Sequence, residues 1–416
     1  NLRSTFGWVN GELRQTIADE LRFDLTPRTL LGLSPAERES QLLSELHALA
    51  ALPFDLQRGP LVRAELYVLG PEESVLFFMP HHAVWDGWSF DVFLNELDQL
   101  YAARVRGETP RLPQLEVDYG DFVEWYNQRL EGPALKPQLD FWLETLQGEL
   151  PVLELPTDRP RPSAMSYAGK TFAFELDATR VERLTAIGRS CGATLYMVLL
   201  AAFEVQLARL TGQRDIIVGT PIRGRNRPEL EHLLGYFVNA MPLRMQLAPE
   251  ESFKAFLARL KTHCVQAFGN QEVPFELLVQ RLGLARDTSR TPLYSAFFTF
   301  QDVRNRRSSV GPLSYDQIHV HAPVSPTELS LWVKQLDHCV VCGLDFATDL
   351  FEDSTAQRWL DEYQLLLAGI CEAPEANLWD LPLLTPSEQV ALQRLVPEAK
   401  PFPEDAWLPE LVAAQS

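Results

Sequence analysis

The stretch MPHHAVWDGWSF (residues 79–90) places two adjacent histidines at the end of an apolar run and, after three more residues, an Asp-Gly pair. The run ESVLFFMP (residues 73–80) is mostly apolar and ends in proline, which predicts a short strand buried on both faces. From Ser89 onward the apolar residues recur at helical spacing, with Ser89 placed to cap the helix. The histidines are therefore expected on a loop between a strand and a helix.

The residues of this loop suit proton transfer. Successive side chains at a strand end point to opposite faces, so only one of His81 and His82 is expected to face a given cleft. A neutral imidazole is a competent base near pH 7, Asp86 is placed to fold back and fix the loop, and Gly87 leaves room for a substrate. A metal site is disfavoured because the histidines diverge and no further His/Cys cluster supports them. Two structural histidines remain the alternative for the motif alone.

Composition limits the classes of function. The chain has 416 residues, 46% of them apolar, which is enough for two domains or one large two-lobed domain. Its 37 Lys and Arg against 56 Asp and Glu give a net charge of −19, which disfavours binding to nucleic acid or anionic membranes. No apolar run approaches bilayer length and the N-terminus lacks a signal-peptide pattern, so a cytoplasmic location is expected.

The five cysteines show no spacing typical of secretory disulfides, which agrees with a reducing compartment. Cys339 and Cys342 form a CxxC pair, which allows a redox or metal-binding interpretation. The β-rich composition of DHCVVCGLDF (residues 337–346) favours packing in a strand instead, where residues three apart face opposite sides. No second CxxC pair completes a zinc site.

Helical and strand patterns alternate along the chain, which predicts an α/β fold. The segment 151–170 is dense in proline and turn formers and is expected to join two lobes, 1–160 and 161–372. Residues 373–416, rich in proline and acidic residues, are expected to be a linker with short helical pieces. In the second lobe, strands are expected at 171–176, 215–221, 236–247 and 292–302, and helices at 180–192, 194–210, 252–268, 274–282 and 355–371.

HHAVWDGWS resembles the HHxxxDG signature of the condensation domains of nonribosomal peptide synthetases. Further stretches resemble that family in order over nearly the whole chain: DYGDFVEWYNQRL (118–130), LELPTDRPRP (153–162), DIIVGTPIRGRNRPELEHLLGYFVN (215–239), NQEVPFELLVQRLGLARDTSRTPLYSAFFTFQ (270–301) and GLDFATDLFEDSTAQRWLDEY (343–363). The resemblance implies two lobes, each similar to chloramphenicol acetyltransferase, that form a V-shaped pseudo-dimer with the HHxxxDG loop in a central tunnel. The family usually begins with a further strand and helix, so the first lobe is expected to lack its first elements.

The resemblance also implies a reaction. The amine of an aminoacyl thioester on a downstream carrier protein attacks an acyl or peptidyl thioester on an upstream carrier, and an amide bond forms. Carried over to this chain, His82 faces the tunnel, His81 and Asp86 support the loop, and Gly87 lies against the reacting centre. Four further positions are implied to line the tunnel or support the site, with Arg225 paired to the aspartate of the motif: Trp88, Ser89, Arg225 and Asn239.

By the same resemblance the domain binds no cofactor of its own. Its substrates arrive on the 4′-phosphopantetheine arms of the upstream and downstream carrier proteins, and an adenylation domain follows in the synthetase. The cluster Arg223, Arg225 and Arg227, or the stretch RNRR (304–307), is expected to attract the phosphate of such an arm. For RNRR, a solvated loop without such a role is the favoured interpretation.

The subtype follows from the residues around the motif. DGWS resembles the chain-elongating kind that takes an L-configured donor, with a starter kind that accepts a fatty acyl group as the runner-up and epimerisation as a third possibility. Heterocyclisation is disfavoured because those relatives replace the histidines by aspartate. From another class, the fold serves as a non-catalytic docking domain that recruits a tailoring enzyme, although such relatives tend to lose the motif.

Overall fold

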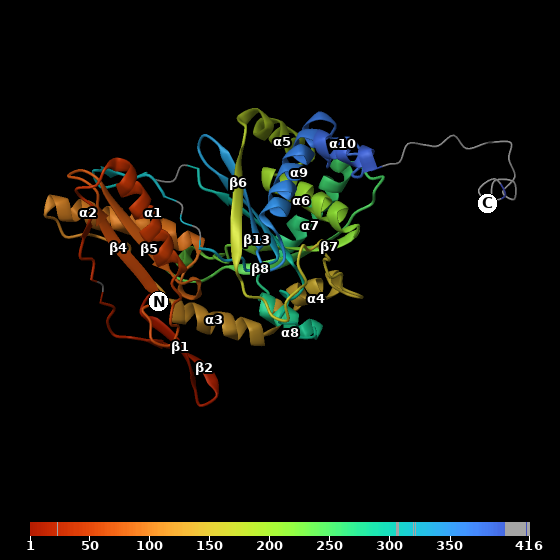
Figure 1. Cartoon of the computed structure of the whole chain (residues 1–416). Coiled ribbons are helices and arrows are strands. Elements are labelled where there is room, and N and C mark those ends of the chain that lie inside the picture. The colour runs from red at the N-terminus through yellow and green to blue at the C-terminus, as the bar shows by residue number, and fades with distance from the viewer. Residues whose placement is uncertain (23, 305–307, 319, 321, 396–412, 414–416) are drawn as a thin grey trace.

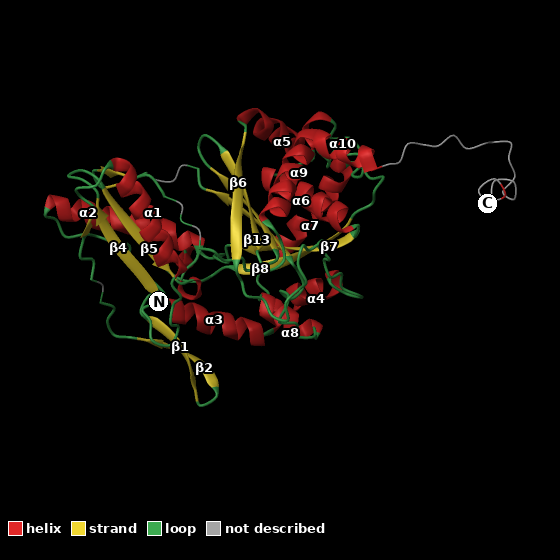
Figure 2. Ribbon diagram, viewed as in Figure 1, coloured by secondary structure: helices red, strands yellow, loops and turns green. Residues whose placement is uncertain are grey.

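The structure is a computed structural model that describes residues 1–416 except 23, 305–307, 319, 321, 396–412 and 414–416. Two lobes lie side by side, with the N-terminal lobe on the left of Figure 1 and the larger second lobe on the right. Figure 2 shows that both lobes combine strands with helices. The expected α/β class and two-lobed organisation are confirmed.

The second lobe is built on a six-stranded mixed sheet with the order β6-β13-β12-β9-β7-β8. β9 pairs in parallel with β12 and β7, and the other neighbours are antiparallel. The strands are β6 (Gly169–Leu176), β7 (Asp215–Ile222), β8 (Asn239–Gln246), β9 (Ala296–Asp302), β12 (Leu329–Gln335) and β13 (Val340–Ala347).

Long helices lie on one side of this sheet (Figures 1 and 2): α5 (Ala178–Ser190), α6 (Leu195–Thr211), α7 (Phe253–Gly269) and α9 (Asp353–Glu372). α6 begins at an N-cap where the Thr194 hydroxyl accepts the N–H of Met197. α6 is apolar around most of its circumference, and such a helix is stable only inside a core. Almost all of its residues up to Ala208 are accordingly buried.

The first lobe is smaller. Its elements are the hairpin β1 (Ser4–Val9) and β2 (Glu12–Ile17), the three-stranded sheet β3 (Arg28–Thr29), β4 (Val62–Val68) and β5 (Ser74–Pro80), and the helices α1 (Pro35–Ala51) and α2 (Gly87–Arg106). Ser34 and Glu37 form a capping box that starts α1. Among the described residues, the buried cluster of this lobe consists of Leu30, Leu42, Leu46, Tyr67, Leu69 and Phe77.

Segments of the chain cross between the lobes. α3 (Tyr119–Glu131) and α4 (Lys136–Thr145) follow the first lobe, yet Trp142 of α4 is buried in the core of the second. In return, the hairpin β10 (Ser309–Val310) and β11 (Leu313–Ser314) lies against α2, where the Gly311 N–H donates to Asp98 Oδ1 at 2.7 Å. Val320 also packs against the buried cluster of the first lobe. Each lobe therefore packs against a segment that belongs, in sequence, to the other lobe.

Two expectations about the strand-loop-helix are wrong. β5 is not buried on both faces: it lies at the edge of its sheet with β4 as its neighbour, and Leu76 is 44% exposed. Asp86, not Ser89, caps α2, and its Oδ1 accepts the Ser89 N–H at 2.8 Å. The helix starts earlier because the aspartate backbone is still extended, the conformation in which a carboxylate reaches the amides of the first turn.

The lobe limits expected from composition also differ from the packing. Side chains before residue 160 lie in the core of the second lobe, namely Trp142, Leu146, Leu153 and Leu155. Leu378 and Leu381, expected in the linker, are buried in that same core, and α10 (Pro386–Leu395) follows them. Residues 396–412 and 414–416 of the expected linker lie outside the described residues. The proline-rich segments expected to join the lobes and to form the linker are irregular in backbone, but part of each packs into the core of the second lobe.

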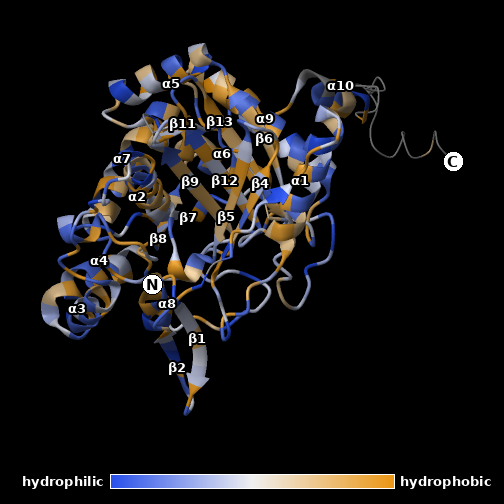
Figure 3. Cartoon of the chain, turned by 90° about the vertical axis from the view of Figure 1, so that its left-hand side faces the viewer, coloured by the Kyte–Doolittle hydropathy of each residue, from blue (hydrophilic) through white to orange (hydrophobic). Residues whose placement is uncertain are grey.

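Hydropathy follows the same architecture. Figure 3 shows apolar residues concentrated on the strands of the second-lobe sheet and around α6. Among the described residues, no single helix is long and apolar enough to span a membrane. α5 and α6 reach that length and hydropathy only when taken together, and they are bent by 97° relative to each other.

Candidate active site

The HHxxxDG loop connects β5 to α2. The His81 N–H donates to the Leu61 carbonyl at 2.8 Å, which extends the pairing beyond the end of β5. A 3-10 turn, η1 (His82–Val84), then reverses the chain, and Asp86 starts α2. Trp85 is buried beneath the turn in edge-to-face contact with aromatic side chains of β5 and α2, namely Phe78, Phe90 and Phe93. The loop is therefore fixed at both ends and from below.

The two histidines have different surroundings. His81 is half-buried, packs edge-on against Phe54 with ring centroids 5.6 Å apart, and accepts the Ala83 N–H on Nδ1 at 3.1 Å. Burial, and after it the neighbouring His82, lower the pKa of His81, which favours its neutral form. The expectation that the histidines differ in role agrees with this arrangement.

His82 is exposed, and its Nδ1 lies 2.7 Å from the Trp85 carbonyl oxygen. A carbonyl oxygen only accepts, so Nδ1 carries the proton of this hydrogen bond. In the neutral ring Nε2 is then left with a free lone pair. On its other side the imidazole meets Tyr236, with ring centroids 5.2 Å apart and an interplanar angle of 79°.

Asp86 is buried and joins the two lobes. Both carboxylate oxygens accept from Arg225 Nη2 at 3.1 Å, and the two side chains are 1% and 0% exposed. Arg225 Nη1 donates to the carbonyls of Leu230 at 2.6 Å and Leu233 at 2.7 Å. Burial lowers the pKa of the Arg225 guanidinium, and the Asp86 carboxylate opposes that effect. The pairing implied by the resemblance is present, and it removes Arg225 from the arginines available to a phosphate.

Ser89 holds a second-lobe backbone segment, residues 235–237, against the loop. Its Oγ accepts the Gly235 N–H at 3.1 Å and lies within donating distance of the Gly235 carbonyl at 3.0 Å and of Asp86 Oδ1 at 2.8 Å. Asp86 Oδ2 also accepts the Phe237 N–H at 3.2 Å. Asp86 and Ser89 of the motif therefore both bind the backbone of the opposite lobe.

Tyr119 of α3 holds the middle of the 235–237 segment. Its hydroxyl donates to the Tyr236 carbonyl at 2.7 Å, and burial raises the pKa of Tyr119 to about 12, which keeps the hydroxyl protonated. Neither tyrosine nor Gly235 or Phe237 was among the expected site residues. The one sequence signal for them is that they lie in DYGDFVEWYNQRL and LLGYFVN, stretches that resemble the family.

Gly87 and Trp88 face different surroundings at the start of α2. Gly87 is exposed, and a methyl group on its Cα would meet no atom within 4 Å apart from its chain neighbours and the backbone of its own helix, so the fold leaves space there. Trp88 instead contacts the second lobe: its Nε1–H donates to the Glu231 carbonyl at 2.9 Å, and the Arg223 guanidinium lies 3.4 Å from its ring centroid. Gly87 faces free volume, whereas Trp88 is a contact between lobes.

Asn239 lies at the start of β8 and is satisfied by the protein itself. Its amide group donates to the carbonyls of Gln271 at 3.2 Å and Val273 at 2.6 Å, and its Oδ1 accepts the Phe275 N–H at 3.0 Å. These bonds fix the start of α8 (Phe275–Leu282). The described contacts make Asn239 a structural support.

The other arginines expected at a phosphate site differ from one another. Arg223 forms an ion pair with Glu231. Arg227 is exposed, lies 4.6 Å from the ring centroid of Trp125, and has no carboxylate partner within the described part of the chain. In RNRR, Arg304 pairs with Asp302 at 2.6 Å, and residues 305–307 lie outside the described residues. Arg227 is therefore the cation of the first cluster that is open to a ligand.

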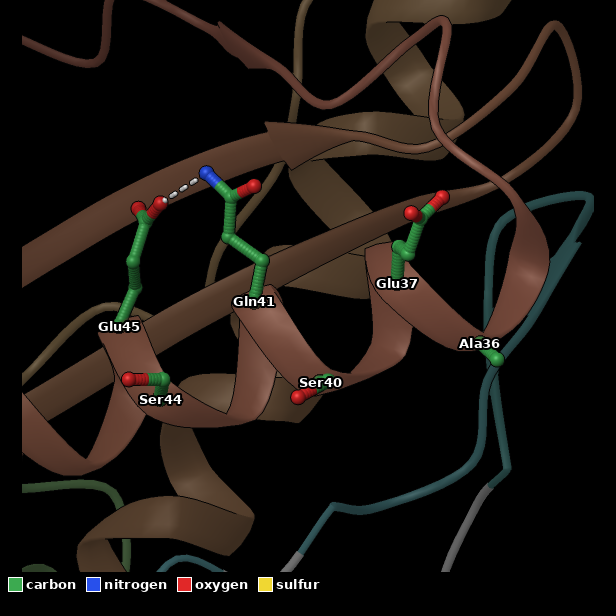
Figure 4. A pocket seen from close by; sticks show the side chains of 6 residues that line it. All are labelled: Ala36, Glu37, Ser40, Gln41, Ser44 and Glu45. Atoms are coloured by element: carbon green, nitrogen blue, oxygen red, sulfur yellow. Dashed lines mark hydrogen bonds between the residues drawn. The ribbon is translucent and has the colours of Figure 1, made fainter.

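Other places that could hold a ligand or metal lie apart from this loop. Cys342 is buried in the core on β13, and burial raises the pKa of its thiol, as expected for packing. Within the described ranges, no group of three or more His, Cys, Asp or Glu is arranged to hold a metal ion. A hollow of about 550 Å³ on α1, shown in Figure 4, is lined by Ala36, Glu37, Ser40, Gln41, Ser44 and Glu45 and includes no residue of the motif.

Known proteins share both the sequence and the fold. A linear gramicidin synthase of Brevibacillus parabrevis is 38% identical over 394 residues, which is 94% of this chain and 8% of that protein. The chain thus spans a small part of this relative. The X-domain in a complex with OxyB from teicoplanin biosynthesis superposes with a TM-score of 0.81 at 27% identity, over 92% of this chain and 84% of that one.

The first condensation domain of the calcium-dependent antibiotic synthetase, solved with a substrate analogue, superposes with a TM-score of 0.75 at 20% identity, over 92% of this chain and 87% of that one. This likeness concerns the fold, and it confirms the chloramphenicol-acetyltransferase-like architecture expected above. The family model of the condensation domain matches residues 1–393, a range that includes the HHxxxDG loop and both lobes. The chain therefore belongs to the condensation domain family.

Proposed function

We propose that this domain joins two carrier-bound substrates through an amide bond and that it is of the chain-elongating kind. The amine of an aminoacyl thioester on a downstream carrier attacks the thioester carbonyl of an acyl or peptidyl group on an upstream carrier. The C–N bond forms, the C–S bond breaks, and the upstream thiol leaves. The observation that supports this proposal most directly is the exposed His82, whose Nδ1–H is engaged by the Trp85 carbonyl and whose Nε2 is free to accept a proton.

His82 is assigned the proton transfer. A free α-amino group has a pKa of about 7.7, so part of the acceptor is already neutral at pH 7 and attack needs no strong base. Attack leaves an extra proton on nitrogen, which Nε2 accepts and returns to the departing thiolate. General base catalysis contributes roughly 10²- to 10⁴-fold, or about 3–5 kcal/mol, whereas alignment of two tethered reactants supplies about 7–11 kcal/mol. Positioning is therefore expected to outweigh base catalysis.

The developing oxyanion needs a positive environment. α2 begins at Gly87 and is 20 residues long, so its N-terminal end carries the partial positive charge of a helix dipole. The free space at Gly87 gives an acyl oxygen access to that end. Gly87 is thus proposed to leave room for the reacting carbonyl, because the protein fold itself does not require a glycine here.

The carriers bring a phosphate to a domain with a net charge of −19. Arg227 is exposed and has no carboxylate partner among the described residues, so we assign it the phosphate of a 4′-phosphopantetheine arm. Arg223 is less suited because Glu231 already shares its charge. Upstream and downstream carriers and an adjacent adenylation domain are the proposed partners.

The test is single-turnover transfer between an acyl carrier and an aminoacyl carrier, followed by intact mass. His82→Ala is expected to lower the rate roughly 10²- to 10⁴-fold, the range of base catalysis, and a loss of at least about tenfold supports the assignment. His47→Ala is the matched control, because His47 is exposed on α1 and bonds the Leu43 carbonyl of its own helix. Transfer that proceeds equally in both variants contradicts the assignment of His82.

A donor series separates the subtypes. A peptidyl or aminoacyl donor that reacts at least tenfold faster than a fatty acyl donor supports chain elongation. The opposite preference makes the domain a starter condensation domain. Both results retain amide formation.

A recruitment function is the alternative, favoured by the likeness to an X-domain found in complex with OxyB. The intact HHxxxDG loop and the free His82 Nε2 argue against it, since a docking surface needs neither. If the carriers bind but no donor gives product, in wild type as in His82→Ala, the assigned function changes from catalysis to recruitment.

A further inference from the structure

Tyr236 contacts His82 from the opposite lobe. The two rings meet edge to face, with centroids 5.2 Å apart and planes at 79°, a favoured geometry for aromatic pairs. Tyr236 is 40% exposed, so surrounding side chains do not enclose it as they enclose a core residue. Its placement against the imidazole therefore depends on its backbone.

That backbone is fixed at three successive residues. The contacts run from Gly235 to Ser89, from the Tyr236 carbonyl to the Tyr119 hydroxyl, and from the Phe237 N–H to Asp86. Gly235 also has no space for a side chain, because an added Cβ would lie 2.6 Å from the Tyr119 ring. Because Asp86 and Ser89 lie only a few residues after His82, this short stretch of chain positions both the His82 imidazole and the Tyr236 ring.

We infer that Tyr236 is a positioning residue for His82, an inference that rests on the function proposed above. The hydrogen bond between Nδ1 and the Trp85 carbonyl fixes one edge of the imidazole but leaves the ring free to rock about that bond. The edge-to-face contact with Tyr236 restrains this motion and keeps Nε2 in one direction. A misplacement of about 1 Å in a catalytic group costs up to roughly 10²-fold in rate.

This assignment explains why a buried aspartate belongs to the motif. Asp86 is 2% exposed and so does not face a substrate. It caps α2, pairs with Arg225 and accepts the Phe237 N–H. Through the 235–237 segment it acts on the ring that faces His82, and thus on the direction of Nε2.

The activity test compares Tyr236→Ala and Tyr236→Phe, each alone and combined with His82→Ala, over a range of carrier concentrations up to saturation. Tyr236→Ala is expected to lower the single-turnover rate about tenfold or more with the half-saturating carrier concentration unchanged. Tyr236→Phe keeps the ring and stays within about threefold of wild type. In the His82→Ala background Tyr236→Ala produces no further loss, because it acts through the missing imidazole. An equal loss in both backgrounds, or a Phe variant as slow as the Ala variant, overturns the inference.

A second measurement does not depend on turnover. The relaxation of the His82 side-chain NMR resonances, which are assigned by their absence in His82→Ala, reports the motion of the ring and is not altered by the mere loss of the Tyr236 ring current. The imidazole is expected to become more mobile in Tyr236→Ala and to keep its wild-type order in Tyr236→Phe and in Tyr167→Ala, a change of an exposed tyrosine elsewhere on the surface. An imidazole as ordered in Tyr236→Ala as in wild type overturns the inference even if the rate falls. A wild type that makes no product contradicts the proposed function instead, and the NMR comparison still decides whether Tyr236 holds His82.

Discussion

The two lobes differ in how far each supports its own structure. The second has a six-stranded sheet and a helix, α6, that is buried along most of its length. The first has a three-stranded sheet, and its buried cluster among the described residues holds six side chains. The HHxxxDG loop nevertheless belongs to the first lobe. The lobe with the smaller core therefore carries the candidate chemistry.

The difference shows where the geometry of the loop comes from. Asp86 is held by Arg225, Ser89 binds Gly235, and Trp88 donates to the Glu231 carbonyl, so three residues at the end of the motif are fixed by the second lobe. The hairpin of β10 and β11, which belongs in sequence to the second lobe, also packs against α2. A loop can vary its chemistry while a rigid scaffold positions it, and here that scaffold is the other lobe.

The largest expected effect is loss of the pair between the lobes. Arg225→Ala leaves the buried Asp86 carboxylate without an opposite charge, which is expected to cost roughly 3–5 kcal/mol of unfolding free energy and to lower amide formation with it. Urea unfolding and single-turnover transfer measure the two effects. Arg223→Ala removes a partly exposed pair to Glu231 and is expected to cost less than about 1 kcal/mol. Similar costs for both variants mean that the first lobe does not depend on the buried pair.

The next comparison tests the two cores directly. Leu200 and Leu46 are 0% and 1% exposed, one in the large core and one in the small cluster. Leu200→Ala is expected to cost about 4 kcal/mol because its dense surroundings cannot close around the cavity, and Leu46→Ala about 2 kcal/mol because a small cluster relaxes. Hydrogen exchange should show Leu46→Ala opening amides of the first lobe alone. Equal costs, with exchange spread over both lobes, contradict the contrast between them.

Apolar periodicity made most of the second lobe predictable. The helix expected at 194–210 is α6 and the strand expected at 215–221 is β7, each within one residue at its ends. In the first lobe α1 and β4 were not expected, although the capping box of Ser34 and Glu37 is a local signal for α1. β4 (VRAELYV) and the surface helix α1 both mix apolar and polar residues, so the apolar pattern of each is weak.

The site was predictable where its residues are consecutive. The motif itself identifies His82, whereas Asp86 and Arg225 are 139 residues apart and were paired by resemblance alone. Tyr236 and Tyr119 were missed because their roles depend on how the lobes pack, which no local pattern encodes. The N-cap role of Asp86 was missed for a local reason, since Ser89 is an equally good cap by residue type.

The smallest expected effect concerns a carboxyl group inside α6. Glu204 is 1% exposed, and neither of its carboxylate oxygens has a hydrogen-bond partner within the described part of the chain. Burial raises its pKa well above the usual value of 4.5, and Arg259 opposes this only in part. The folded protein therefore keeps a proton that the unfolded chain releases above about pH 4.5. Stability then falls as pH rises from that value towards the raised pKa.

Glu204→Met is expected to raise the unfolding free energy at pH 8 by roughly 1–3 kcal/mol, the usual cost of an unpaired buried polar group, and by less at pH 5. Glu204→Gln removes the titration but keeps an unpaired amide, so it should flatten the pH dependence with a smaller gain. Urea unfolding at both pH values measures this. A gain that is the same at pH 5 and pH 8 means that the carboxyl titrates alike in the folded and unfolded protein. If the gain does grow with pH, the large core of the second lobe tolerates the cost of an unpaired buried carboxyl. The six-residue cluster of the first lobe has fewer contacts with which to offset such a cost. This difference in stability between the cores is consistent with the second lobe fixing the loop of the first.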